Sequence, residues 1–69
     1  MSEAEKVVAR LSDAQKEALR PRDDGDTHVR PGTRIATARK LYRVGLMNYH
    51  WRLTPLGLAV RAILTEQAR

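Results

Sequence analysis

The sequence contains no cysteine and no phenylalanine, and tryptophan occurs once, at Trp51. Without cysteine there is no disulfide, no thiolate metal site and no cysteine nucleophile. Tyr42, Tyr49 and Trp51 are the only aromatic residues. The core therefore has to be built mainly from Leu, Val, Ile and Ala, which is typical of packed helices with little strand.

Long hydrophobic runs are also missing. No apolar stretch approaches the ~20 residues that span a bilayer, and the opening residues, MSEAEKVVAR, place acids where a secretory signal has a positive start. We therefore expect a soluble cytoplasmic protein without membrane contact. The length of 69 residues corresponds to a single domain, 1–69, with residues 1–11 as either part of it or a frayed N-terminal extension.

Acidic residues are unevenly distributed along the chain. Residues 27–65 hold seven Arg or Lys and no Asp or Glu, whereas residues 1–26 hold seven acids against five bases, and the net charge is +5. A concentrated positive field attracts polyanions and speeds their encounter. These charges indicate a nucleic-acid partner; the alternative interpretation is a solvated arginine-rich face.

Residue types that perform catalysis or bind metals are sparse. His28 and His50 are the only histidines, and they do not have the spacing of metal ligands. Ser12 has the position of a helix cap, and no carboxylate in the basic half could complete a catalytic triad with either histidine. The acidic cluster at 23–26 lacks the closing glutamate of a calcium loop. We therefore expect a non-enzyme with no cofactor and no metal.

The first helical pattern lies in residues 3–19, where apolar residues recur on one helical face. Ser12 and Gln15 have the spacing of a capping box, which predicts a helix starting near Ser12, preceded by a less regular helical turn or two. An unbroken helix is the alternative, and Pro21 ends the helix in both cases. The loop 20–32 follows, in which residues 27–29 could add a short strand beside a later hairpin.

A second helix is predicted over Arg34–Val44, after an N-cap at Thr33. Gly45 then occupies the left-handed position that follows many helices. No Glu lies at a spacing that would pair with the basic residues of this helix, which favours a binding role over a merely solvated face. The expected buried face is Ile35, Ala38, Leu41 and Tyr42, and the expected outer face is Arg34, Thr37, Lys40 and Arg43, with Arg39 flanking.

A short ribbon, residues 46–54, is predicted next, with Leu46 in the core and a turn around Asn48–His50. By the two-residue period of a strand, Trp51 and Leu53 share one face and Arg52 points the other way. Trp51 and Tyr42 could stack on bases, but core positions are expected for both, whereas Tyr49 is expected to be exposed. Thr54 caps the last helix and Pro55 takes its first position. The apolar side of that helix is Leu56, Val60, Ile63 and Leu64, with Leu58 off this face.

The run TARKLYRVGLM, followed by WRLTPLG, resembles the winged helix-turn-helix superfamily. It is similar to small bacterial and phage proteins and to regulators of the multiple-antibiotic-resistance and phenolic-acid-repressor kinds. The resemblance covers Thr33 to Leu64. It implies a mostly α fold with a small β-hairpin, a truncated winged helix in the order helix, loop, recognition helix, short wing and C-terminal helix. The matching positions are Thr37, Leu41, Gly45, Leu46, Leu53, Thr54 and Gly57.

The resemblance further implies a DNA-binding transcriptional regulator of a bacterium or phage, associated with the nucleoid, with double-stranded DNA as its partner. A homodimer is expected, because one short recognition helix offers little contact. The residues implied to contact DNA are Arg34, Thr37, Lys40 and Arg43 on the recognition helix, with Arg39 and the wing residue Arg52 on flanking phosphates.

One feature of the sequence favours a second hypothesis. The segment RPRDDGDTHVRPG stands where a helix-turn-helix has its positioning helix, and it cannot form one. The same fold could therefore bind an acidic protein partner through its basic face, without DNA binding. RNA binding through that face is a third hypothesis.

Overall fold

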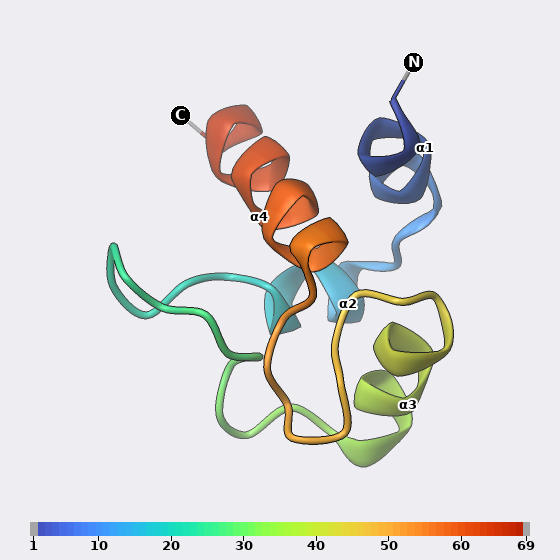
Figure 1. Ribbon diagram of the computed structural model, residues 1–69, viewed down its shortest axis with the longest axis vertical. Coiled ribbons are helices and arrows are strands. Elements are labelled where there is room, and N and C mark those ends of the chain that lie inside the picture. Colours follow the sequence, from blue (N-terminus) through green and yellow to red (C-terminus); the bar gives the residue numbers. More distant parts are fainter. Residues whose placement is uncertain (1, 69) are drawn as a thin grey trace.

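Residues 2–68 are described by a computed structural model. They form four helices, α1 (Glu3–Arg10), α2 (Asp13–Ala18), α3 (Ile35–Arg43) and α4 (Pro55–Gln67), and very little strand. α1 packs against α4, and α2 packs against α3. Figure 1 shows that the loop between α2 and α3 projects on one side of the molecule, and that α3 lies on the other.

None of the helices that the structure describes combines the length and the apolar character needed to cross a lipid bilayer.

The helix start predicted at Ser12 is confirmed. The Ser12 hydroxyl accepts from the backbone N–H of Gln15 at 3.3 Å, and the Gln15 side chain accepts from the N–H of Ser12 at 2.9 Å. The alternative of an unbroken helix is wrong, because Leu11 adopts extended backbone between α1 and α2. α1 has a capping box of its own at Ser2, and its Ala4 and Val8 are buried in the core.

The second helix is observed one residue shorter at each end than the predicted Arg34–Val44. α3 covers Ile35–Arg43, and its N-cap residue is Arg34, which makes no side-chain capping bond. Thr33 is not the cap, because its hydroxyl donates to the carbonyl of Arg30 at 2.6 Å. The left-handed conformation predicted for Gly45 is confirmed. Gly45 has a φ of +82°, and Leu46 then turns into the core and is fully buried.

The predicted buried face of α3 is half wrong. Ala38 and Leu41 are buried, but Ile35 is 65% exposed and Tyr42 is 50% exposed. Ile35 and Tyr42 are seven residues apart, so they lie on one edge of the helix, beside the residues 47–51. A domain of this size has a high ratio of surface to volume, and the core reaches only a narrow stripe of α3.

The ribbon forms isolated antiparallel bridges, Met47 with Leu53 and His28 with Arg52, and no longer strand within residues 2–68. The segment 27–29 does lie beside the ribbon, since Leu53 donates to the Thr27 carbonyl at 2.8 Å. The strand period does not extend to Trp51, whose φ is +63°. Leu53 is buried as predicted, while Trp51 is only partly buried. A regular wing hairpin is therefore absent from the described residues.

The start of α4 matches the prediction in detail. The Thr54 hydroxyl accepts from the N–H of Gly57 at 3.1 Å, and Pro55 occupies the first helical position. Val60 is fully buried in the core, and Leu58 is 39% exposed. The four largest fully buried side chains come from different parts of the chain, so that the core joins α2, α3, the ribbon and α4: Leu19, Leu41, Leu46 and Val60.

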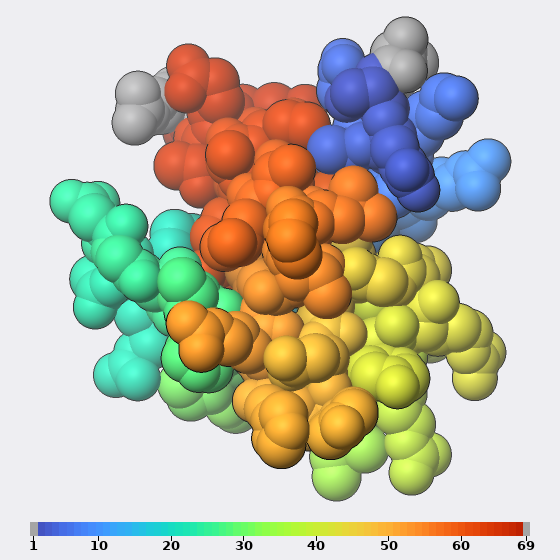
Figure 2. Space-filling model, viewed as in Figure 1, coloured from blue at the N-terminus to red at the C-terminus, as the bar shows by residue number. Residues whose placement is uncertain are grey.

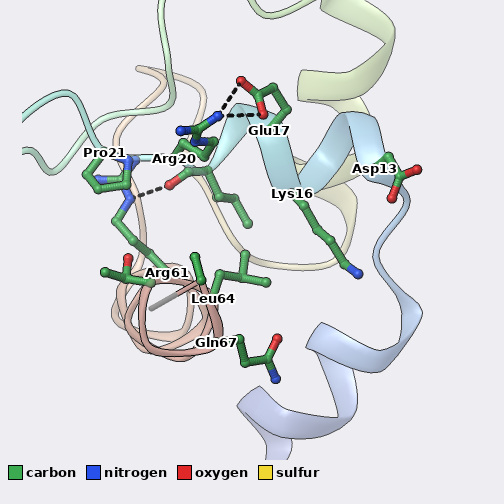
Figure 3. A pocket seen from close by; sticks show the side chains of 11 residues that line it. Asp13, Lys16, Glu17, Arg20, Pro21, Arg61, Leu64 and Gln67 are labelled. Atoms are coloured by element: carbon green, nitrogen blue, oxygen red, sulfur yellow. Dashed lines mark hydrogen bonds and ion pairs between the residues drawn. The ribbon is translucent and has the colours of Figure 1, made fainter.

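Arg61 of α4 is buried, with 6% of its surface exposed, and it is not part of the basic surface that the sequence suggested. Its guanidinium donates to the carbonyls of Leu19 at 2.6 Å, Asp26 at 2.7 Å and His28 at 2.6 Å. The Asp26 carboxylate lies 3.9 Å from the same guanidinium. Figure 3 shows the bond from Arg61 across to the end of α2. Arg61 therefore links α4 to the loop that carries the acidic cluster at 23–26, which we call the acidic loop.

Candidate nucleic-acid interface

The outer face of α3 presents Arg39, Lys40 and Arg43, which are all exposed. We call these three residues the α3 basic face. Arg39 and Arg43 are four residues apart, and Lys40 and Arg43 are three apart, so the side chains are neighbours on the helix surface. Within residues 2–68 none of the three forms a side-chain hydrogen bond or an ion pair. Their charges are therefore available to a partner.

Arg34 and Thr37 lie at the edge of α3 that faces α2. Both line a shallow pocket against α2, together with Glu17. Thr37 is partly buried and Arg34 is exposed. Thr37 is three residues from Lys40 on the helix surface, but it borders the core side of α3, which is the Ala38 and Leu41 side, and so it lies at the edge of the predicted outer face. Arg39, predicted to flank the face, lies within it.

Arg52 is exposed on the ribbon. Its backbone forms the bridge to His28, and its N–H donates to the Asn48 side chain at 3.1 Å. It does not line the pocket that lies beside α3. Arg52 therefore lies on the side of the ribbon that faces His28, and it is separate from the α3 basic face.

An apolar groove runs between α3 and the ribbon turn, and the sequence did not predict it. Arg39 and Arg43 border this groove. The only signals for it in the sequence are the aromatic residues close to the end of the helix. We call it the α3 groove; its apolar lining is Ile35, Ala38, Tyr42, Met47, Tyr49 and Trp51.

Two of the aromatic rings of the groove, those of Tyr42 and Tyr49, are exposed to solvent. Tyr49 is 75% exposed, as predicted, whereas the core position predicted for Tyr42 is wrong. The ring centroids of Tyr42 and Tyr49 are 6.5 Å apart with a tilt of 54°, and those of Tyr49 and His50 are 4.7 Å apart with a tilt of 46°. The rings are tilted and not stacked in parallel, and Tyr42 and Tyr49 keep at least half of their surface in solvent.

Asn48 holds the turn that presents these rings. Its side-chain oxygen accepts from the N–H groups of His50 at 2.9 Å and Arg52 at 3.1 Å, and its carbonyl accepts from Trp51 at 3.1 Å. The Trp51 carbonyl in turn accepts from Val29 at 2.8 Å. The bulky Trp51 is thereby kept at a positive φ, which costs on the order of 1–3 kcal/mol.

The acidic loop does not neutralise the α3 basic face. Asp26 is bound to Arg61 and to the N–H groups of Arg22 and His28, each at 3.0 Å. These two backbone donors, together with the nearby guanidinium, lower the pKa of the Asp26 carboxyl. In Figures 1 and 2 the loop around residues 22–26 lies at the opposite edge of the molecule from α3.

A second groove, between α2 and the end of α4, has charges of both signs. Lys16, Arg20, Asp13 and Glu17 surround it (Figure 3). Arg20 already pairs with Glu17 at 3.3 Å. Arg61 also lines this groove but is buried and lies beside Asp26, so the exposed charges of the groove balance and do not select a partner. Within the described chain, no group of three or more His, Asp or Glu side chains is placed to hold a metal ion.

No family model matches this chain, and the searches of curated proteins and of solved structures returned no match either.

Proposed function

We propose that the protein binds double-stranded DNA and acts as a small transcriptional regulator of the winged-helix kind in a bacterium or phage. The observation that supports this proposal is the α3 basic face, which is exposed and has no partner among residues 2–68. A surface of three clustered cations on one helix attracts phosphates and releases their counterions on binding.

The dimensions of α3 suit the major groove. Nine residues at ~1.5 Å per residue give a helix of roughly 14 Å, and the major groove, ~12 Å wide, admits an α-helix. Arg39, Lys40 and Arg43 would contact phosphates or guanine edges. Arg34 at the start of α3 and Arg52 on the ribbon would add flanking phosphate contacts. Thr37 would touch DNA only at the edge nearest α2.

A homodimer would double this small contact surface, as it does in many helix-turn-helix proteins. Leu58 is an exposed apolar residue of α4 and is available for pairing with a second copy.

The test is the double substitution Lys40→Ala with Arg43→Ala. We expect weaker duplex binding and a flatter salt dependence, with the slope of log K against log salt reduced by roughly 1.8, as for two lost phosphate contacts. Fluorescence anisotropy of a labelled duplex over a series of salt concentrations measures both quantities.

The matched control is Lys6→Ala with Arg10→Ala. It removes the same charge from exposed positions on α1, distant from α3 in Figure 1. We expect it to leave the slope nearly unchanged. An equal effect of the two double variants would show that net charge alone drives binding, and the absence of any binding by the intact protein at low salt would refute the proposal.

A second candidate function is the binding of an acidic protein partner. The observation in its favour is that residues 20–33, which join α2 to α3, form no helix, so α3 does not follow the preceding helix across the short turn of a helix-turn-helix. In that case the intact protein would not bind duplex DNA at low salt.

A further inference from the structure

The α3 groove is lined mainly by apolar and aromatic side chains. Contacts of the α3 basic face with phosphates or base edges do not explain why these side chains are exposed. Ile35, Tyr42 and Tyr49 expose 65%, 50% and 75% of their surfaces. Exposed large apolar groups that gather around one groove mark a site of interaction. A phosphate backbone makes no use of apolar side chains, so the groove requires an additional part of a ligand.

Charge decides the kind of occupant. Arg39 and Arg43 border the groove, and no acid occurs anywhere in residues 27–65. The occupant must therefore combine anionic groups with flat apolar ones. A second copy of the chain fits poorly, because a two-fold contact at this groove would bring the arginines of both copies together.

A single strand of nucleic acid has both properties. Proteins that bind single strands combine a positive groove for the backbone with aromatic side chains on which bases stack. Here Tyr42, Tyr49 and Trp51 supply aromatic rings, and Arg39 and Arg43 supply the charge. Asn48 holds the turn so that Tyr49 and Trp51 lie along the groove.

We infer that the α3 groove takes unpaired nucleobases, so that the protein prefers DNA in which a duplex continues into a single strand. This inference rests on the proposed function, since α3 holds the duplex and the groove holds the strand that leaves it. The preference comes from stacking and not from hydrogen bonds to base edges, and it is therefore tolerant of sequence.

The experiment compares a blunt duplex with the same duplex bearing a single-stranded overhang of about six nucleotides. Binding is measured by anisotropy at matched salt, and the fluorescence of Trp51, the only tryptophan, reports on the groove. We expect roughly tenfold tighter binding of the overhang duplex, the size of about one base–aromatic stack, and quenching of Trp51 by the overhang duplex alone.

Two substitutions at Tyr49 test the stacking. Tyr49→Ala removes the preference for the overhang, and Tyr49→Phe retains it, because the ring face is kept. Val44→Ala, which trims an exposed apolar side chain outside the groove, also retains it. The comparison of blunt and overhang duplexes uses the unsubstituted protein, so it tests the inference even if a variant fails to fold.

The outcomes separate the two proposals. Equal affinity for blunt and overhang DNA, or a preference that survives Tyr49→Ala, overturns the base site and leaves duplex binding standing. Binding of a free single strand with Trp51 quenching, but of no blunt duplex, supports the base site and overturns duplex binding. Trp51 quenching on self-association, or by a polyglutamate peptide in place of DNA, assigns the groove to a second copy or to an acidic protein and overturns the inference.

Discussion

At the scale of single residues, Arg61 shows how burial changes the meaning of a charge. In the sequence it is one of seven bases in an acid-free stretch. In the structure it donates to three backbone carbonyls and lies beside Asp26. Burial lowers the pKa of its guanidinium, and the Asp26 carboxylate opposes this effect. Arg61 therefore stabilises the loop and does not contribute to the binding surface.

Substitution of Arg61 by Met should destabilise the protein strongly. The substitution leaves three carbonyls without their donor and the Asp26 carboxylate without its ion-pair partner, and breaking a buried ion pair in this way costs about 3–5 kcal/mol. Urea unfolding followed by far-UV circular dichroism measures the loss. Arg20→Ala is the control, because the Arg20 pair with Glu17 is more than half exposed on both sides and such pairs contribute about 0–1 kcal/mol. Similar losses in the two variants would contradict the role of Arg61.

At the scale of elements, the junction of the ribbon and α4 depends on a glycine. A side chain at Gly57 would collide with the carbonyl oxygen of Leu46 and lie 3.3 Å from Cβ of Leu53. The Gly57 N–H is also the group that the Thr54 cap binds. The close approach of α4 to the residue after Gly45 is therefore possible only without a Cβ at this position.

Substitution of Gly57 by Ala should destabilise the fold, although Ala is the better helix former by about 1 kcal/mol. The collision is with backbone, which cannot rotate away, and overpacking of this kind costs roughly 1–3 kcal/mol. The same substitution at Gly25, where nothing lies within 4 Å and φ is not positive, should be neutral or slightly stabilising. Thermal unfolding of the two variants compares them directly, and a stabilised Gly57→Ala protein would show that α4 can move away from Leu46.

At the scale of the whole molecule, the acidic loop is separated in space from the α3 basic face. The acidic loop and the α3 basic face occupy opposite edges (Figure 2), and α4 holds the acidic loop through Arg61 and Asp26. Because of this separation, the acidic loop does not cancel the positive field of the α3 basic face. The stability of the fold also depends on the ionised Asp26, because Asp26 pairs with Arg61 where the loop meets α4.

The free energy of unfolding should fall at acid pH for this reason. Hydrogen bonds from the Arg22 and His28 N–H groups place the pKa of Asp26 below its ordinary value of 3.8 in the folded protein. The unfolded chain thus binds more protons in this range, so the contribution is fully present above pH 3.8 and is lost as the pH falls through the folded pKa.

Asp26→Asn should reduce this acid dependence, and its curve should approach that of the unsubstituted protein at low pH. Urea unfolding at a series of pH values gives both curves. Asp24→Asn, at an exposed position of the same loop, is the control and should keep the slope. Parallel curves for the unsubstituted protein and Asp26→Asn would contradict the assignment.

The sequence by itself determined three of the boundaries between elements: the start of α2, the turn after α3 and the start of α4. Ser12 with Gln15, Gly45, and Thr54 with Pro55 act through bonds or backbone angles within three residues of themselves, and such local effects can be predicted from sequence.

Only the tertiary structure decided which faces are covered. Tyr42, expected in the core, is exposed, and Arg61, one of the bases of the acid-free stretch, is buried. Exposure depends on which distant segment packs against a helix. The small core covers one stripe of α3 and leaves the aromatic edge of that helix in solvent, while the loop carbonyls of residues 19–28 find their donor on α4. The contacts of Arg61 span more than 30 residues of chain and leave no periodic pattern in the sequence, and the α3 groove depends on how the turn of the ribbon folds back beside α3.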